Sequence, residues 1–137
     1  MSITDPISNM FSAIKNAQKI KNDTLIVPFS KIKQQILQIF VKEGYISSFD
    51  KVEKDNNKNY LKINLKYTKH GIPAIDSLNR ISKPSKRIYL SKKDIYKVLS
   101  GYGTLILSTS NGIVTGKYAR RNNVGGEVIC EVYWCLN

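Results

Sequence analysis

Apolar residues recur at helical spacing in two stretches of the first half of the chain, which predicts two amphipathic helices. The first helix begins at Pro6, which fits a first helical turn because it has no amide hydrogen to donate. Ser30 can cap the second helix and Gly44 can end it. The apolar stripes consist of Ile7, Met10, Phe11 and Ile14 in the first helix and of Ile32, Ile36, Ile39 and Phe40 in the second.

Between and after these helices the pattern changes to the alternation that is typical of strands. A short strand is predicted over 24–27, and a hairpin is predicted to pair 45–52 with 60–67 across a polar turn. Leu61, Ile63 and Leu65 face one side of the second hairpin strand. The first half therefore predicts an α-β-α-β-β unit with two helices against a small sheet.

The second half of the chain is predicted to be mainly β. A short helix is expected to begin at Ser91, because Asp94 follows it at capping-box spacing, and to turn Ile95, Val98 and Leu99 inward. A basic loop or helical turn is expected over 116–123. Strands are expected over 75–82, 87–91, 105–109, 113–115 and 127–134.

These elements predict an α+β fold with two small domains, the second a mainly antiparallel β unit with one short helix. We expect an N-terminal α/β domain over 1–67, a linker over 68–74 and a mainly β domain over 75–137. No apolar run approaches the ~20 residues of a membrane span, and the N-terminus has no basic and apolar stretch typical of a secretory signal. No membrane partner is therefore expected, and the expected compartment is the cytoplasm.

Charge points to a polyanionic partner. The chain carries 22 Lys and Arg against 10 Asp and Glu, for a net charge of +12 and an isoelectric point near 9.7. Such an excess favours nucleic acid through attraction and counterion release. All the arginines lie in the second half of the chain, and the planar guanidinium suits phosphate better than the ammonium of lysine does.

The sequence offers no metal site and no cofactor. A zinc site needs about four ligands, whereas this chain has Cys130, Cys135 and a single histidine, His70, in the linker. Cys130 is expected to be a buried small hydrophobe, and a disulfide is not expected in a reducing compartment. No catalytic residue is assigned.

The sequence Ser108-Thr109-Ser110-Asn111-Gly112 follows a buried strand and raises three alternatives. A serine nucleophile needs a base within reach, but the one histidine is distant and no Gly-x-Ser-x-Gly elbow is present. These residue types are also ordinary turn formers. The third alternative is RNA contact, because hydroxyl groups both donate and accept hydrogen bonds and so suit the ribose-lined minor groove of an RNA helix.

The same residues carry a family resemblance. Residues 106–115, followed by Ala119-Arg120 and by residues 124–130, resemble the signature of bacterial-type small-subunit ribosomal protein eight. Further blocks of this family occur in order along essentially the whole chain: Asp5-Pro6-Ile7, residues 14–17, Val27-Pro28, residues 42–46 and residues 80–84. The departures are Asn111, where the family often has a basic residue, Ser85, where glycine is common, and the extra C-terminal residues 135–137.

The resemblance implies a structural, non-enzymatic protein of the small ribosomal subunit that binds a stem in the central domain of the ribosomal RNA and assists assembly. It implies ribosomal proteins five and two as neighbours, and the messenger RNA of its own operon as a second ligand through which the protein represses translation. An organellar ribosome is an alternative location. A general basic RNA-binding module outside the ribosome is the alternative function.

The resemblance also places the main RNA contact on the second domain. Ser108, Thr109 and Ser110 would touch sugar and base edges, with Tyr89 against a ribose or base and Glu127 accepting from a donor group. Gly112 and Gly126 would allow close backbone approach, beside Asn111. The phosphate candidates are Lys83, Lys86, Arg87, Lys117, Arg120 and Arg121, and the candidates for a secondary contact from the first domain are Thr4, Lys15, Asn16, Ser30 and Lys31.

Overall fold

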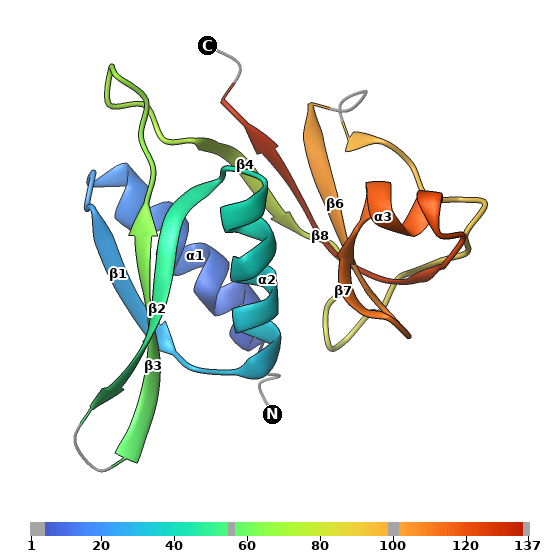
Figure 1. Cartoon of the computed structure of the whole chain (residues 1–137), viewed down its shortest axis with the longest axis horizontal. Coiled ribbons are helices and arrows are strands. Elements are labelled where there is room, and N and C mark those ends of the chain that lie inside the picture. The colour runs from blue at the N-terminus through green and yellow to red at the C-terminus, as the bar shows by residue number, and fades with distance from the viewer. Residues whose placement is uncertain (1–4, 55–56, 99–101, 136–137) are drawn as a thin grey trace. The chain divides into compact units, whose positions relative to one another are not determined.

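The computed structural model describes residues 5–54, 57–98 and 102–135. Within these residues the chain forms two compact units. The first unit is Ile7–Ile75, and the second comprises Asp5 and Pro6 together with the residues from Asp76 onward. Each unit contains its own β-sheet (Figure 1).

The first unit has the predicted order of elements, α-β-α-β-β. Its sheet is antiparallel, with β3 (Lys58–Leu65) between β1 (Thr24–Pro28) and β2 (Ile46–Lys54). The helices α1 (Pro6–Lys19) and α2 (Lys31–Lys42) lie on the same side of this sheet (Figure 1). The predicted hairpin is therefore confirmed, and its strands run slightly further toward the turn than the sequence pattern indicated.

The core of the first unit lies between the helices and the sheet. The predicted stripe of α1 is buried, as are the three alternating residues of β3. Phe40 is central, because its ring lies 6.2 Å from the ring of Phe11 and 5.8 Å from that of Tyr45, measured between centroids. Gly44 ends the α2 region with φ +83°, a left-handed conformation that glycine adopts without strain.

The predicted stripe of α2 is wrong at two of its positions. Ile32 is 36% exposed and Ile39 is only partly buried, whereas Lys33 and Leu37 are buried beside the two correctly predicted residues. Lys33 fits there because its aliphatic stem packs inward while its ammonium donates to the carbonyl oxygen of Pro28 at 3.1 Å. Burial lowers the pKa of this lysine. The buried face of α2 is thus rotated relative to the predicted stripe, because the aliphatic stem of a lysine occupies a core position for which an apolar residue was expected.

The second unit is an antiparallel sheet with strand order β4-β8-β6-β7, in which β5 also pairs with β8. One short helix follows β7 and lies over the sheet (Figure 1). The elements are β4 (Ile75–Arg80), β5 (Tyr89–Leu90), β6 (Gly103–Thr109), β7 (Gly112–Thr115), α3 (Gly116–Arg121) and β8 (Gly126–Trp134).

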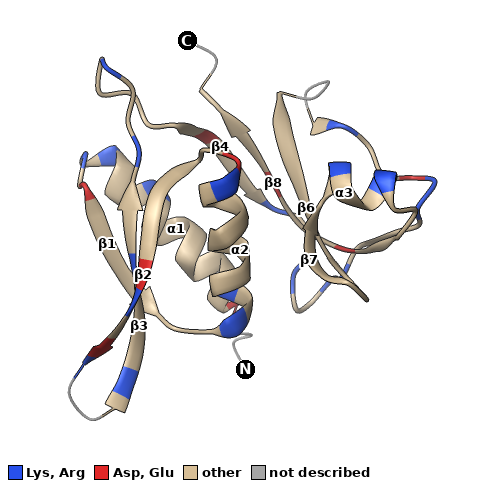
Figure 2. Cartoon of the chain, viewed as in Figure 1, with Lys and Arg blue, Asp and Glu red and all other residues tan. Residues whose placement is uncertain are grey.

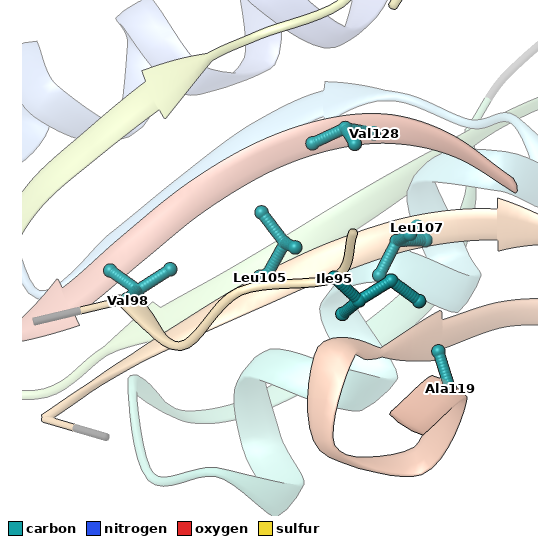
Figure 3. Close-up of a cluster of buried hydrophobic side chains, with 6 residues drawn as sticks. All are labelled: Ile95, Val98, Leu105, Leu107, Ala119 and Val128. Carbon is teal, nitrogen blue, oxygen red and sulfur yellow. The ribbon is translucent and has the colours of Figure 1, made fainter. Parts of the chain in front are cut away.

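The core of the second unit lies between α3 and one face of the sheet (Figure 3). Leu105 and Leu107 of β6 and Val128 of β8 meet Ala119 of α3 there. The segment before β6 completes the cluster with Ile95 and Val98, both buried as predicted; Leu99 lies outside the described residues.

The short helix predicted to begin at Ser91 is wrong for the described part of that segment, residues 91–98, which forms a turn over 92–94 and no α-helix. The hydroxyl of Ser91 donates to the carboxylate of Asp94 at 2.8 Å, so the two side chains bond to each other and do not form the reciprocal side-chain-to-backbone bonds of a capping box. The short helix of this unit is α3, in the stretch expected to be a basic loop or helical turn.

Candidate nucleic-acid interface

A row of paired residues crosses the sheet of the second unit beside the β6–β7 turn. Tyr89 of β5 pairs with Glu127 of β8, Glu127 pairs with Ser108 of β6, and Ser108 pairs with Ile113 of β7. Directly paired residues of antiparallel strands project from the same face, so these four side chains share one face of the sheet. We refer to these four residues as the cross-strand row. Tyr89, at one end of the cross-strand row, is 65% exposed.

The hydroxyl groups of the turn differ in their availability. Thr109 donates to the carbonyl oxygen of Gly112 at 3.0 Å and accepts from the amide of Asn111 at 3.1 Å, so its hydroxyl closes the turn. Within the described residues, the hydroxyl groups of Ser108 and Ser110 make no hydrogen bond, and Ser110 is exposed. The two serines therefore keep their donors for a ligand, whereas Thr109 has already used its own.

The glycines near the turn serve the fold of the sheet. Gly112 has φ +97° and nothing within 4 Å of a Cβ built on it, so glycine is favoured there by backbone conformation. A Cβ on Gly126 would lie 2.2 Å from the carbonyl oxygen of Ser108 and 2.9 Å from Cγ2 of Thr109. The close approach at Gly126 is thus between β8 and β6.

The carboxylate in the cross-strand row has a cationic partner. Arg87 donates from Nη1 to both carboxylate oxygens of Glu127, at 3.2 and 3.0 Å. The arginine side chain is 54% exposed, and such surface pairs add only about 0–1 kcal/mol to stability. The main effect of the pair is local: it offsets a negative charge that would repel phosphate and holds a guanidinium beside the row.

The basic loop before β5 is held by a buried serine that the sequence interpretation missed. Ser82 accepts from the amide of Ile88 at 2.7 Å and donates to the carbonyl oxygen of the same residue at 3.1 Å. Lys83 and Lys86 close the loop through reciprocal backbone hydrogen bonds of 2.9 and 3.0 Å, and both side chains are exposed. A serine directly before a Lys-Pro turn was the only signal for this role, and it is weak, because serine is common in turns.

The basic residues of α3 lie on the opposite face of the sheet. The neighbours of the cross-strand row along each strand are Leu90, Leu107, Val114 and Val128, which all pack in the cluster that contains Ala119 of α3. Because successive side chains of a strand point to opposite faces, the row and α3 lie on different sides. Lys117 and Arg121 are exposed there, and Arg120 donates to the backbone carbonyl of Tyr96 at 3.1 Å.

The candidates for a secondary contact belong to the first helix region and to α2. Lys15 and Asn16 are exposed on α1, and Lys31 is exposed at the first residue of α2. The hydroxyl of Ser30 accepts from the amide of Lys33 at 3.2 Å, so Ser30 is the predicted cap of α2. Thr4 lies outside the described residues.

The cysteine thiols do not belong to the candidate interface. Cys130 is buried as predicted, and its burial raises the pKa of its thiol, which therefore stays protonated. Both cysteines are free. Over residues 5–54, 57–98 and 102–135 no group of three His, Cys, Asp or Glu side chains is placed to hold a metal ion, and no helix in these ranges is long and apolar enough to cross a membrane.

Tyr96, which no sequence pattern singled out, has a strongly perturbed hydroxyl. It donates a hydrogen bond to Glu131, and burial together with this carboxylate raises its pKa from 10 to about 12. The folded chain then keeps a proton that the unfolded chain loses between these values, so the contribution of this group to stability is complete below pH 10 and declines as the pH rises toward 12.

We expect Glu131→Gln to lower the pKa of Tyr96 toward its ordinary value, because the charge that opposes ionisation is removed. Spectrophotometric titration of tyrosinate absorbance measures this change, with Tyr96→Phe identifying the transition. If the high-pH transition assigned in this way is the same in Glu131→Gln as in the original chain, the carboxylate is not its cause.

Comparison with known proteins matches almost the whole chain. Residues 5–133 match the family model described as ribosomal protein S8. A protein of Thermodesulfovibrio yellowstonii named small ribosomal subunit protein uS8 is 47% identical over 131 residues, which cover 96% of this chain and 99% of that relative. Proteins of the same name from Lactococcus lactis and Clostridioides difficile are 47% and 44% identical over 133 residues, which cover 97% of this chain and 100% of each relative.

Proposed function

Because the chain belongs to the ribosomal protein S8 family, we propose that it is a structural, non-catalytic component of the small ribosomal subunit and binds ribosomal RNA through its second unit. The names of its relatives support the place in the subunit. The cross-strand row and the adjacent β6–β7 turn support the mode of binding. Together they combine the free hydroxyls of Ser108 and Ser110 with an exposed tyrosine and adjacent cations.

In this proposal, the serines read the RNA surface and the cations hold its backbone. Ser108 and Ser110 donate to and accept from 2′-hydroxyl groups and base edges in the shallow minor groove of a stem. Tyr89 lies against a ribose or base and extends its hydroxyl to a polar group. Lys83, Lys86 and Arg87 contact phosphates, which sets the register without reading sequence.

We propose further that the target is an irregular stem in the central domain of the small-subunit RNA, bound early in assembly. Small-subunit proteins five and two are the proposed neighbours. The messenger RNA of the protein's own operon is a second proposed ligand. These finer points rest on the family resemblance alone.

Binding measured across a range of salt concentrations tests the two roles. In the Ser108→Ala, Ser110→Ala double variant we expect binding to weaken by about 1–3 kcal/mol at every salt concentration, because neutral hydrogen bonds are lost and no phosphate contact changes. In the Lys83→Gln, Lys86→Gln double variant we expect the log–log salt slope to become shallower by roughly 2. Filter binding or fluorescence anisotropy with the labelled stem measures both.

An unchanged affinity in the serine variant would contradict hydroxyl recognition while leaving phosphate binding in place. Thr109→Val is a poor test, since it also removes the hydrogen bonds that close the turn. Competition with an unrelated RNA duplex separates the proposal from a general basic RNA-binding module. Displacement by that duplex at concentrations similar to those of the unlabelled stem would favour the general module.

A further inference from the structure

We infer that the second unit has a second RNA-binding face, on the side of the sheet opposite the cross-strand row, which binds a separate RNA segment. We refer to it as the α3 face. It is formed by α3 together with the segment before β6 and consists of Lys92, Lys93, Lys97, Lys117, Tyr118 and Arg121, all exposed. The inference rests on the proposed function only in taking RNA as the ligand.

The two segments of the α3 face form one surface because several contacts join them. Ile95 packs in the cluster of Ala119 (Figure 3), and its Cγ2 lies 3.6 Å from a Cβ built on Gly116. Arg120 reaches across from α3 to the backbone carbonyl of Tyr96 at 3.1 Å. The hydroxyl of Tyr96 is bonded in turn to Glu131 of β8, so residues 92–97 are tied to both α3 and the sheet.

Charge on this face is strongly positive. With Arg120, residues 92–97 and α3 supply six basic side chains, and the carboxylates nearby are Asp94 and Glu131. Each carboxylate already accepts a hydrogen bond within the chain, from Ser91 and from Tyr96. Figure 2 shows lysine and arginine on α3 and along the segment that passes beside it. Such an excess of cations over carboxylates matches a phosphate backbone.

The aromatic group makes RNA a better partner than an acidic protein. Tyr118 is 43% exposed on α3, and Lys117 and Arg121 lie one helical turn apart beside it. An exposed ring between cations is the arrangement that binds single-stranded nucleic acid, in which bases stack on the ring and cations follow the backbone. The ligand class is therefore an unpaired RNA strand or loop.

A single stem on the cross-strand row does not account for the α3 face. The row projects from one side of the sheet, while α3 covers the residues that project from the other. The second unit would thus join two RNA segments.

Photocrosslinking of the full-length chain to RNA tests this inference with two natural tyrosines as reporters. The probe is small-subunit ribosomal RNA purified from Lactococcus lactis, whose relative is 47% identical to this chain. After short-wavelength irradiation, mass spectrometry detects nucleotide adducts on Tyr89 and Tyr118, and reverse-transcription stops locate them in the RNA. Protection of lysines from acylation by the bound RNA gives a second measurement that does not depend on photochemical yield.

We expect adducts on both tyrosines, at different RNA segments, and protection of Lys117 as well as Lys83. The Lys117→Gln, Arg121→Gln variant should lose most of the Tyr118 adduct and keep that of Tyr89. The control variant, Lys58→Gln with Lys69→Gln, removes the same charge from the first unit and should keep both adducts.

Three outcomes would overturn the inference. If Tyr89 reacts while Tyr118 shows no adduct and Lys117 no protection, the α3 face does not bind RNA although the proposed function stands. If both tyrosines map to one segment, the face is an extension of the first site. If neither tyrosine reacts and no lysine is protected, the proposed function fails with it.

Discussion

Replacement of Gly126 by alanine should destabilise the second unit by about 4 kcal/mol or more, the range reached only by severe packing defects. The new Cβ would lie 2.2 Å from the carbonyl oxygen of Ser108, and this neighbour is backbone of the adjacent strand and cannot rotate away. β8 must then separate from β6 where Glu127 pairs with Ser108. Urea unfolding followed by the fluorescence of Trp134, the single tryptophan and a residue of β8, measures the change.

Gly112→Ala is the matched control, because it adds the same methyl group in β7, the strand on the other side of β6 from β8. A Cβ there meets nothing within 4 Å, and only the positive φ of +97° opposes it. We expect a cost of about 1–2 kcal/mol from backbone strain. A cost for Gly126→Ala no greater than that of the control would contradict the close approach between β6 and β8.

The sequence predicts the first unit well because its signals are local. The stripe of α1, the Ser30 cap, the Gly44 end and the alternation of β3 each depend on neighbours within a few residues. The exception is α2, where Lys33 takes a core position with its aliphatic stem. A hydropathy pattern treats lysine as polar along its whole length, so it predicts a buried face of α2 that is rotated from the observed one.

The elements of the candidate site were predictable, but their arrangement was not. Tyr89, Ser108 and Glu127 were each named from the sequence, yet they meet only through strand pairings between distant segments. A register shift between Ile106 and Leu107 in the pairing of β6 with β8 sets which residue of β8 lies beside Ser108. Such a bulge leaves no clear sequence pattern. The internal bonds of Thr109 are likewise visible only in three dimensions.

The arrangement of the α3 face is even harder to predict from the sequence. Lys92 and Lys117 are separated by 25 positions, and α3 follows the turn so closely in sequence that its cations were grouped with the serines. The side of the sheet that α3 covers depends on the alternation of Leu107 and Ser108 and on the packing of Ala119. Charge along the chain indicates the type of ligand, whereas strand geometry decides from which face of the sheet each cation projects.

The second large effect is expected at Arg80, whose guanidinium is mostly buried. Its Nε lies 3.1 Å from Oδ2 of Asp5, the side chains are only 12% and 15% exposed, and Nη1 donates to the carbonyl oxygen of Ile129 at 2.8 Å. Arg80→Met keeps the apolar stem but leaves the carboxylate of Asp5 without this cation. Removing one member of a buried pair is strongly destabilising, and we expect a loss of about 3 kcal/mol in the free energy of unfolding.

A double-mutant cycle with Asp5→Asn separates the ion pair from the other contacts of Arg80. The carbonyl of Ile129 keeps a second donor, the amide of Ile81 at 3.0 Å, so most of the cost of Arg80→Met should come from Asp5. Since Asp5→Asn removes the charge that would be left, the double variant should be less destabilised than the sum of the single variants by about 1–3 kcal/mol. Additive losses would instead show that the guanidinium stabilises the second unit through Ile129 and its packing, and that the ion pair to Asp5 contributes little.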